Sequence, residues 1–157
     1  MPSNEQSKLS LGSLITPNRV LFAQGRPGKK ELIEALVRTV CRDYPQLDPA
    51  DVASQVLKRE EGISTTLDTG LSIPHARLEE LGDFTAALAV LPEPLRDQTN
   101  SDLSIRVMFL FLSPAKPAFF QKHLQILSTL AETFKPEFIQ ELVSLQDAGA
   151  VAARLAR

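Results

Sequence analysis

Residues 105–112 read Ile-Arg-Val-Met-Phe-Leu-Phe-Leu, a nearly continuous apolar run. Residues 84–91, Phe-Thr-Ala-Ala-Leu-Ala-Val-Leu, form a second run of strand length. Such runs, above all one rich in Ile, Val and Phe, are typical of strands buried on both faces of a sheet. A sheet of this kind needs helices on each face, so the two runs predict an α/β fold.

Two helices are predicted ahead of these strands. The first follows a turn rich in Gly and Pro, starts near Lys29 and ends before Pro45. Its apolar stripe consists of Ile33, Leu36, Val37, Val40 and Cys41. The second starts at Pro49, with Asp48 as its cap, and should end at about Glu60.

The stretch between the second helix and the long strands is the least regular. Residues 62–70 are predicted as a loop or short strand, and residues 71–73 as a brief strand that stops at Pro74. His75 would then stand at the end of that strand. The polar residues 92–104, which include two prolines, are predicted to be a loop between the two long strands.

Helices return after the second long strand. A helix that follows residues 113–117 has apolar residues at the i, i+3, i+4, i+7 spacing. This stripe consists of Phe120, His123, Leu124, Leu127, Leu130, Ala131 and Phe134. Pro136 ends that helix, residues 138–143 form the next, and Asp147 caps a last one. Near the start of the chain, residues 9–23 are predicted to be an irregular entry or a first short strand.

The composition excludes several classes of protein. With 157 residues, 43% hydrophobic and 23% charged, the chain is long enough for one folded domain. Its net charge of −2, from 17 Lys and Arg against 19 Asp and Glu, argues against nucleic-acid binding through bulk positive potential. The single cysteine, Cys41, excludes an internal disulfide and a cysteine-built metal site. The sequence has no run of about 20 apolar residues and no secretory signal, which predicts a cytoplasmic location without membrane insertion.

The chain has two histidines, His75 and His123, and each has an ordinary explanation. A histidine after a proline is commonly a turn residue, although groups at strand ends often bind or react. A histidine on the apolar stripe of a helix, as His123 is, commonly packs in the core. Arg59, near a helix C-terminus, would by itself only complement the helix dipole. Taken singly, these residues predict no activity.

Taken together, the same residues resemble a known family. Residues 59–65 (Arg-Glu-Glu-Gly-Ile-Ser-Thr) and 70–77 (Gly-Leu-Ser-Ile-Pro-His-Ala-Arg) resemble the active-site segment of enzyme IIA of the phosphoenolpyruvate-dependent phosphotransferase system. The branch is the fructose/mannitol and nitrogen-regulatory one. Residues 109–114, followed by His-Leu-Gln-Ile-Leu-Ser-Thr-Leu-Ala at 123–131, resemble the second signature of this family, a strand and then a helix.

The resemblance spans nearly the whole chain and implies a fold. The opening residues 9–40, with two lysines at 29–30, resemble nitrogen-type members. We therefore expect a flexible tail over residues 1–8 and one family domain over residues 9–157. The family fold implied is a single α/β domain with a central mixed sheet of about five strands, flanked by helices on both faces.

The resemblance also implies a chemistry in which His75 accepts a phosphoryl group. The donor would be a histidine-phosphorylated carrier protein, HPr or its nitrogen-branch counterpart, and neither metal nor cofactor is needed. A neutral imidazole can attack through its lone pair, while the guanidinium of Arg59 would meet the negative charge of the transferring group. His123 would orient His75 or donate a hydrogen bond to the phosphoryl group. Further phosphate contacts are expected from Ser64, Thr65 and Arg77.

These roles set a geometric expectation for the site. The imidazoles of His75 and His123 and the guanidinium of Arg59 must lie together at one end of the sheet, in a pocket open to water. Around it we expect a shallow apolar docking patch with a charged rim. Candidates for that patch are Leu71, Phe119 and Phe120. The next partner in the relay would be a IIB domain or a regulatory target protein.

Several functions remain open at this point. A nitrogen-regulatory phosphocarrier and a sugar-pathway IIA subunit would have the same sequence features. The segment Thr-Leu-Asp-Thr at 66–69 stands where the family usually has glycines, and a non-catalytic sensor or interaction module on the same fold would account for it. A metal hydrolase built on His75, His123 and Asp68 or Glu60 is a further alternative, although neither histidine belongs to a metal-type motif.

Overall fold

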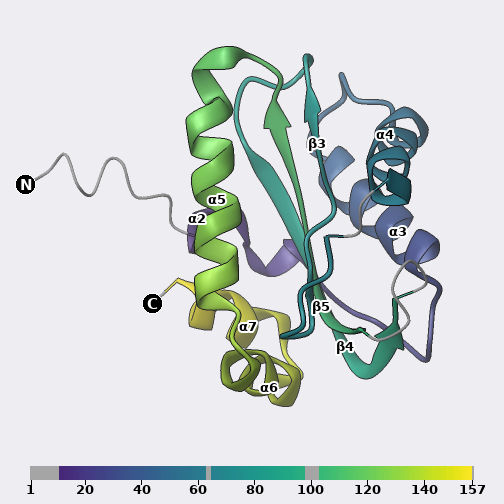
Figure 1. The fold of residues 1–157 in the computed structure, drawn as a ribbon, viewed down its shortest axis with the longest axis vertical. Helices are drawn as coiled ribbons and strands as arrows, with labels where there is room; N and C mark the ends of the chain where they lie inside the picture. Colours follow the sequence, from purple (N-terminus) through teal and green to yellow (C-terminus); the bar gives the residue numbers. More distant parts are fainter. Residues whose placement is uncertain (1–10, 63–64, 98–102, 157) are drawn as a thin grey trace, which may run out of the picture.

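One mixed sheet of five strands lies between two layers of helices in the described residues, as predicted (Figure 1). This computed structural model describes residues 11–62, 65–97 and 103–156, so the tail expected at residues 1–8 lies outside it. The strands are β1 (Val20–Phe22), β2 (Leu71–Ser72), β3 (His75–Leu78), β4 (Thr85–Arg96) and β5 (Ser104–Pro114).

The two apolar runs form the centre of the sheet. The strand order is β1-β4-β5-β2, and β3 also pairs with β5, further along the same edge as β2. β4 and β5 are antiparallel, whereas β1, β2 and β3 are each parallel to their partners. Alternate side chains of β5 enter two separate cores, with Leu110 on one face and Phe109 and Phe111 on the other.

Each face of the sheet has its own set of helices (Figure 1). One face is covered by α3 (Lys29–Cys41), whose apolar stripe is buried as predicted, and by α4 (Pro49–Gly62). The other face is covered by α2 (Leu11–Leu14), α5 (Phe120–Thr133), α6 (Pro136–Leu145) and α7 (Ala148–Leu155). Single 3₁₀ turns at Pro17–Arg19 and Pro117–Phe119 precede β1 and α5. The Asp147 side chain caps α7 by accepting from the Ala150 N–H at 2.8 Å, as predicted.

The prediction of a loop over residues 92–104 is wrong for residues 92–96. β4 continues to Arg96, through both prolines. Its pairing with β5 shifts register between Val90 and Leu95, and such an irregularity accommodates prolines that a regular ladder would reject. Residues 98–102 of the predicted loop lie outside the described residues.

Three further differences concern local structure. His75 begins strand β3 instead of standing at a strand end, because the chain resumes pairing with β5 directly after Pro74. The irregular entry contains one helical turn, α2, before the predicted strand. On α5 the buried residues are His123, Ile126 and Leu130, whereas Phe120 and Leu124 are exposed. The predicted stripe therefore includes two residues that face solvent, and it omits Ile126, which is fully buried.

Candidate functional site

The ring of His75 has a defined orientation and a defined tautomer. Its Nδ1 lies 2.7 Å from the carbonyl oxygen of Ile73, which can only accept, so Nδ1 carries the proton. The other nitrogen, Nε2, accepts a hydrogen bond from Nε of Arg59 at 3.1 Å. Phe111, its register partner on β5, stacks against the ring with centroids 5.3 Å apart. The neutral ring thus keeps a lone pair on Nε2 and holds its proton on Nδ1.

Arg59 reaches His75 around the edge of the sheet. The residue lies in the last turn of α4, which packs on one face, while His75 and Phe111 point toward the opposite face. β3 pairs only with β5 among the described strands, so its outer side is open to the guanidinium. Arg59 itself is exposed to solvent. Its side chain can therefore turn away from Nε2 without disturbing the core.

His123 lies beside His75, as the geometric expectation required. The two ring centroids are 5.3 Å apart, and Nδ1 of His123 lies 2.7 Å from the hydroxyl oxygen of Ser113. Phe111 contacts both imidazoles and Phe120 stacks on the outer face of His123. With Nδ1 occupied by Ser113, Nε2 is the ring atom of His123 left to interact with a bound group.

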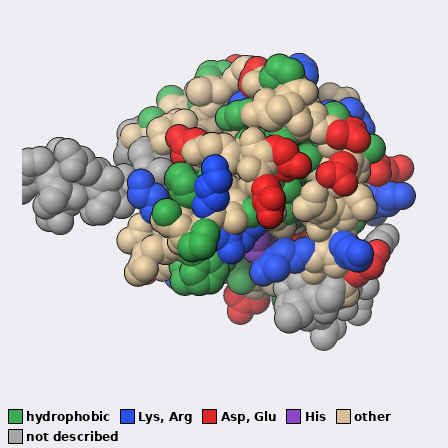
Figure 2. All heavy atoms as spheres, turned by 90° about the horizontal axis from the view of Figure 1, so that it is seen from above, with side chains coloured by type: hydrophobic (Ala, Val, Ile, Leu, Met, Phe, Trp, Pro, Cys, Tyr) green, Lys and Arg blue, Asp and Glu red, His purple; other side chains and the backbone are tan. Residues whose placement is uncertain are grey.

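These side chains line one pocket of about 410 Å³. Its lining residues are Gln55, Arg59, His75, Ala76, Arg77, Phe120 and His123. His75 is 3% exposed and His123 is 4% exposed, so the opening to water is narrower than expected. The exposed side chain of Arg59 lies against Nε2 of His75 at this opening. Figure 2 shows a small histidine surface set between basic side chains on this side of the molecule.

The residues predicted to contact the phosphate do not all line this pocket. Arg77 lines the pocket, with its Nη2 donating to the Lys116 carbonyl at 3.1 Å. Thr65 does not line it, because its hydroxyl donates to Glu60 at 2.5 Å. Ser64 lies outside the described residues. Asp68, whose charge would oppose a phosphate, sits in the turn before β2 and is not among the lining residues.

The expected docking patch needs one correction. Leu71 is fully buried in β2, so it cannot contact a partner. Phe120 is exposed next to the pocket, and Phe119 is partly buried against Phe84. Leu124, one turn after Phe120 on the same side of α5, is also exposed, although the helix pattern placed both residues on the apolar stripe.

Burial and nearby cations keep both imidazoles neutral. Desolvation lowers the pKa of His75, helped by Arg59, while the Ile73 carbonyl and Glu60 act in the opposite direction. The pKa of His123 is lowered to about 4, first by burial and then by His75, Arg77 and Arg59. A neutral His75 is the form that has a free electron pair for attack.

The low pKa of His123 predicts acid sensitivity. The unfolded chain binds a proton on this residue below about 6.5, whereas the folded chain binds it only below about 4. Stability rises with pH wherever the unfolded state binds more protons, so the free energy of unfolding should fall as pH drops from 6.5 toward 4. Denaturant titrations near neutral and acidic pH should show a smaller loss for His123→Gln than for the wild type. Equal losses of unfolding free energy in the two proteins would contradict a lowered pKa of His123.

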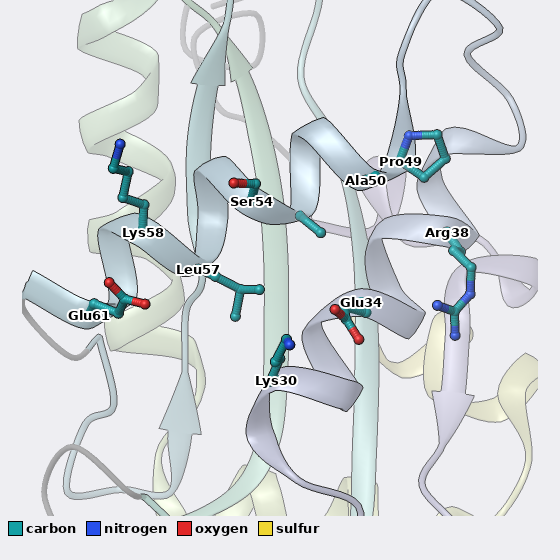
Figure 3. A pocket seen from close by; sticks show the side chains of 10 residues that line it. Lys30, Glu34, Arg38, Pro49, Ala50, Ser54, Leu57, Lys58 and Glu61 are labelled. Atoms are coloured by element: carbon teal, nitrogen blue, oxygen red, sulfur yellow. The ribbon is translucent and has the colours of Figure 1, made fainter.

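A larger pocket, about 760 Å³, lies between α3 and α4 and contains neither histidine. Figure 3 shows its walls, with Lys30, Glu34 and Arg38 on α3 and Lys58 and Glu61 on α4. Charged side chains of both signs surround an apolar floor, and no histidine, the acceptor that a phosphohistidine relay needs, lines this pocket. The chemistry therefore points to the smaller pocket, and the larger one supplies matched control positions.

The metal hydrolase and the question of membrane insertion can both be examined on the described residues. Within residues 11–62, 65–97 and 103–156, no group of three His, Cys, Asp or Glu side chains is arranged to hold a metal ion, which disfavours the metal hydrolase. None of the helices in these segments is both long and apolar enough to cross a membrane.

Ser113, Gln55 and the Ile73 carbonyl belong to the site but were missed from the sequence. Gln55 stands one turn before Arg59 on α4, a spacing that placed it on the same side of the helix. No sequence signal marked Ser113, because its contact with His123 depends on how α5 packs against β5. The Ile73 carbonyl is a backbone group, invisible to any pattern of side chains.

Comparisons with known proteins point in one direction. Residues 13–157 match the family model for "Phosphoenolpyruvate-dependent sugar phosphotransferase system, EIIA 2". The PTS system fructose-specific EIIA component of Haloferax volcanii is 31% identical over 130 residues, covering 82% of this chain and 83% of that protein. A nitrogen regulatory protein of Pseudomonas aeruginosa is 27% identical over 123 residues, covering 78% of this chain and 79% of that protein.

A solved structure agrees with these relatives. The crystal structure of the nitrogen regulatory protein IIA-Ntr from Neisseria meningitidis superposes with a TM-score of 0.80 at 28% identity. The match covers 92% of this chain and 98% of the other. The mixed sheet with helices on both faces is therefore shared with a nitrogen regulatory IIA protein.

Proposed function

This chain belongs to the EIIA 2 family of the phosphoenolpyruvate-dependent sugar phosphotransferase system, and we propose that it carries a phosphoryl group on Nε2 of His75. The observation that carries this proposal is the pair of hydrogen bonds on the His75 ring. Nδ1–H donates to the Ile73 carbonyl, and Nε2 faces the pocket with its lone pair. A fixed tautomer leaves one nitrogen able to react.

The transfer needs no general base. The lone pair of Nε2 forms a bond to phosphorus while the bond between phosphorus and a nitrogen of the donor histidine breaks. The electron pair of that broken bond returns to the donor imidazole, and no proton moves. The His75 ring then carries a positive charge, which the Ile73 carbonyl stabilises through the Nδ1 proton.

Arg59 would change partners during this step. At rest it donates to Nε2 and covers the nucleophile. When the donor approaches, the exposed side chain can turn and place its guanidinium on the equatorial phosphoryl oxygens, which carry the negative charge of the transition state. Arg77, which also lines the pocket, supplies a second guanidinium, and Nε2 of His123 supplies a neutral donor.

The proposed donor is a histidine-phosphorylated carrier protein of the HPr type. An apolar residue beside the pocket, Phe120, and the neighbouring Leu124 provide surface for such a partner. Because the relatives include several nitrogen regulatory proteins, we assign the chain to the nitrogen-regulatory type, with a IIB domain or a regulatory target as the next partner. Its output would then be a phosphorylation-dependent change in binding.

Incubation with enzyme I, the carrier protein and phosphoenolpyruvate tests the proposal. The intact mass should rise by about 80 Da, that of one phosphoryl group, and the adduct should be lost in acid. A known member of the family should be labelled in parallel. If that member takes up the group and this chain does not, the non-catalytic interaction module becomes the better account.

A further inference from the structure

Three buried charged side chains meet behind the site. Lys29 and Glu60 have side chains that are 8% and 6% exposed, and the side chain of Asp97 is fully buried. Nζ of Lys29 lies 2.8 Å from Oε1 of Glu60 and 3.3 Å from Oδ2 of Asp97. A buried ion cluster is costly to desolvate and contributes little more stability than apolar packing would. Stability alone is therefore a weak explanation for it.

The cluster fastens four separate segments to one another. Lys29 is the first residue of α3, Glu60 lies in the last turn of α4, and Asp97 directly follows β4. The loop after α4 is attached as well. Thr65 donates its hydroxyl to Oε2 of Glu60 at 2.5 Å, and Thr66 donates its hydroxyl to Oδ2 of Asp97. The start of the segment that leads to His75 is thus tied to the cluster.

One line of contacts runs from the cluster to Nδ1 of His75. The carbonyl of Thr65 accepts from the backbone N–H of Ile73 at 3.2 Å. The carbonyl of Ile73 in turn accepts from Nδ1 of His75 at 2.7 Å. The position of the group that selects the His75 tautomer therefore depends on a residue bonded to Glu60.

A second line runs from the cluster to Nε2. Arg59 precedes Glu60 in the last turn of α4 and donates to Nε2 of His75 at 3.1 Å. Helix ends fray unless they are held by neighbours. The ion pair between Glu60 and Lys29 holds this turn on the side of α3, so it fixes the point from which Arg59 extends.

We propose that Lys29, acting through Glu60 and Asp97, is a positioning residue that fixes the ring orientation and tautomer of His75 for phosphoryl transfer. The expected effect of Lys29 on the rate of phosphoryl acceptance rests on the proposed function. The expected effect on the orientation and tautomer of His75 concerns the unphosphorylated protein alone. A misplacement of about 1 Å at a reacting group is enough to slow a reaction by about 100-fold, so a remote anchor of this kind matters to the rate.

Lys29→Met removes the cation and keeps a side chain of similar length. The carboxylates of Glu60 and Asp97 then lose the ammonium group that both contact, which should loosen the last turn of α4 and the attached loop. We expect a second tautomer of His75 and a rate of phosphoryl acceptance reduced by about 10- to 100-fold. Lys30→Met is the matched control, since Lys30 is exposed on the next position of the same helix.

Nitrogen-15 NMR of the histidine rings, recorded before any phosphorylation, reads the tautomer directly. Wild type and Lys30→Met should show His75 with its proton on Nδ1, and Lys29→Met should show a mixture. If Lys29→Met retains the wild-type tautomer and rate while only its melting temperature falls, the cluster is merely structural and the inference is overturned. A wild type that takes up no phosphoryl group would refute the proposed function, yet the tautomer shift would still support the positioning role.

Thr65→Val covers the case in which Lys29→Met fails to fold. The change keeps nearly the same side-chain shape and adds no charge. It removes only the hydroxyl that donates to Glu60. We expect a smaller shift of the same kind in the ring signals of unphosphorylated His75. If the ring signals are unchanged in a folded Thr65→Val protein, the link from the cluster to Ile73 is absent and the inference fails.

Discussion

His75→Ala is expected to abolish phosphoryl acceptance completely. The reaction requires a nitrogen lone pair, and the methyl side chain of alanine offers none. His123 is not a substitute, because its Nδ1 is occupied by Ser113 and its Nε2, as a hydrogen-bond donor, carries the proton and has no free lone pair. Intact-mass measurement after incubation with the donor should therefore show the unmodified mass alone.

A control must separate loss of the acceptor from loss of the fold. His75 is 3% exposed and packs against Phe111, so alanine leaves a small cavity there. His75→Gln keeps most of the volume and should give the same zero activity with a near-native melting temperature. An acid-labile adduct on either variant would show that another residue receives the group.

Arg59→Gln is expected to slow phosphoryl acceptance by about 10- to 100-fold. Two effects oppose each other here. The variant uncovers Nε2, but the resting hydrogen bond of an exposed arginine is worth only about 1.5 kcal/mol. Loss of a donor aimed at transition-state charge costs about 2.7–4 kcal/mol. The loss of charge stabilisation should therefore dominate over the easier access.

Lys58→Gln is the matched control for Arg59→Gln. Lys58 precedes Arg59 on α4 and carries the same charge, but it lines the larger pocket between α3 and α4 (Figure 3). Its replacement should leave the single-turnover rate within about twofold of the wild-type rate. Solvent screens an exposed charge that lies outside the pocket of the two histidines. Equal slowing in both variants would mean that overall charge, and not the contact with Nε2, sets the rate.

The central strands and most helices could be predicted because their signals are local. The runs at 84–91 and 105–112 are apolar except for one residue each, and the Asp48-Pro49 and Asp147 caps mark helix starts that the structure confirms. β3 was missed because a proline such as Pro74 commonly ends a strand, whereas pairing with β5 resumes at the next residue. The extension of β4 through two prolines depends on a register shift, which no local pattern predicts.

The site could be predicted in part, for a similar reason. Arg59, His75 and His123 are recognisable from motif order, and the structure brings all three together. The contacts that orient them come from tertiary packing. Thr65, expected at the phosphate, is bonded to Glu60 instead, and Glu60 is held by a lysine 31 positions earlier in the chain. Such long-range partners have no signature in a single sequence.

The most direct test of the central claim is to identify which atom bears the phosphoryl group. Phosphorylated protein with nitrogen-15 histidine should show phosphorus coupled to Nε2 of His75, while Nδ1 keeps its proton. That result follows from the hydrogen bond between Nδ1 and the Ile73 carbonyl. Phosphorus coupled to Nδ1 of His75, or to any nitrogen of His123, would contradict the account.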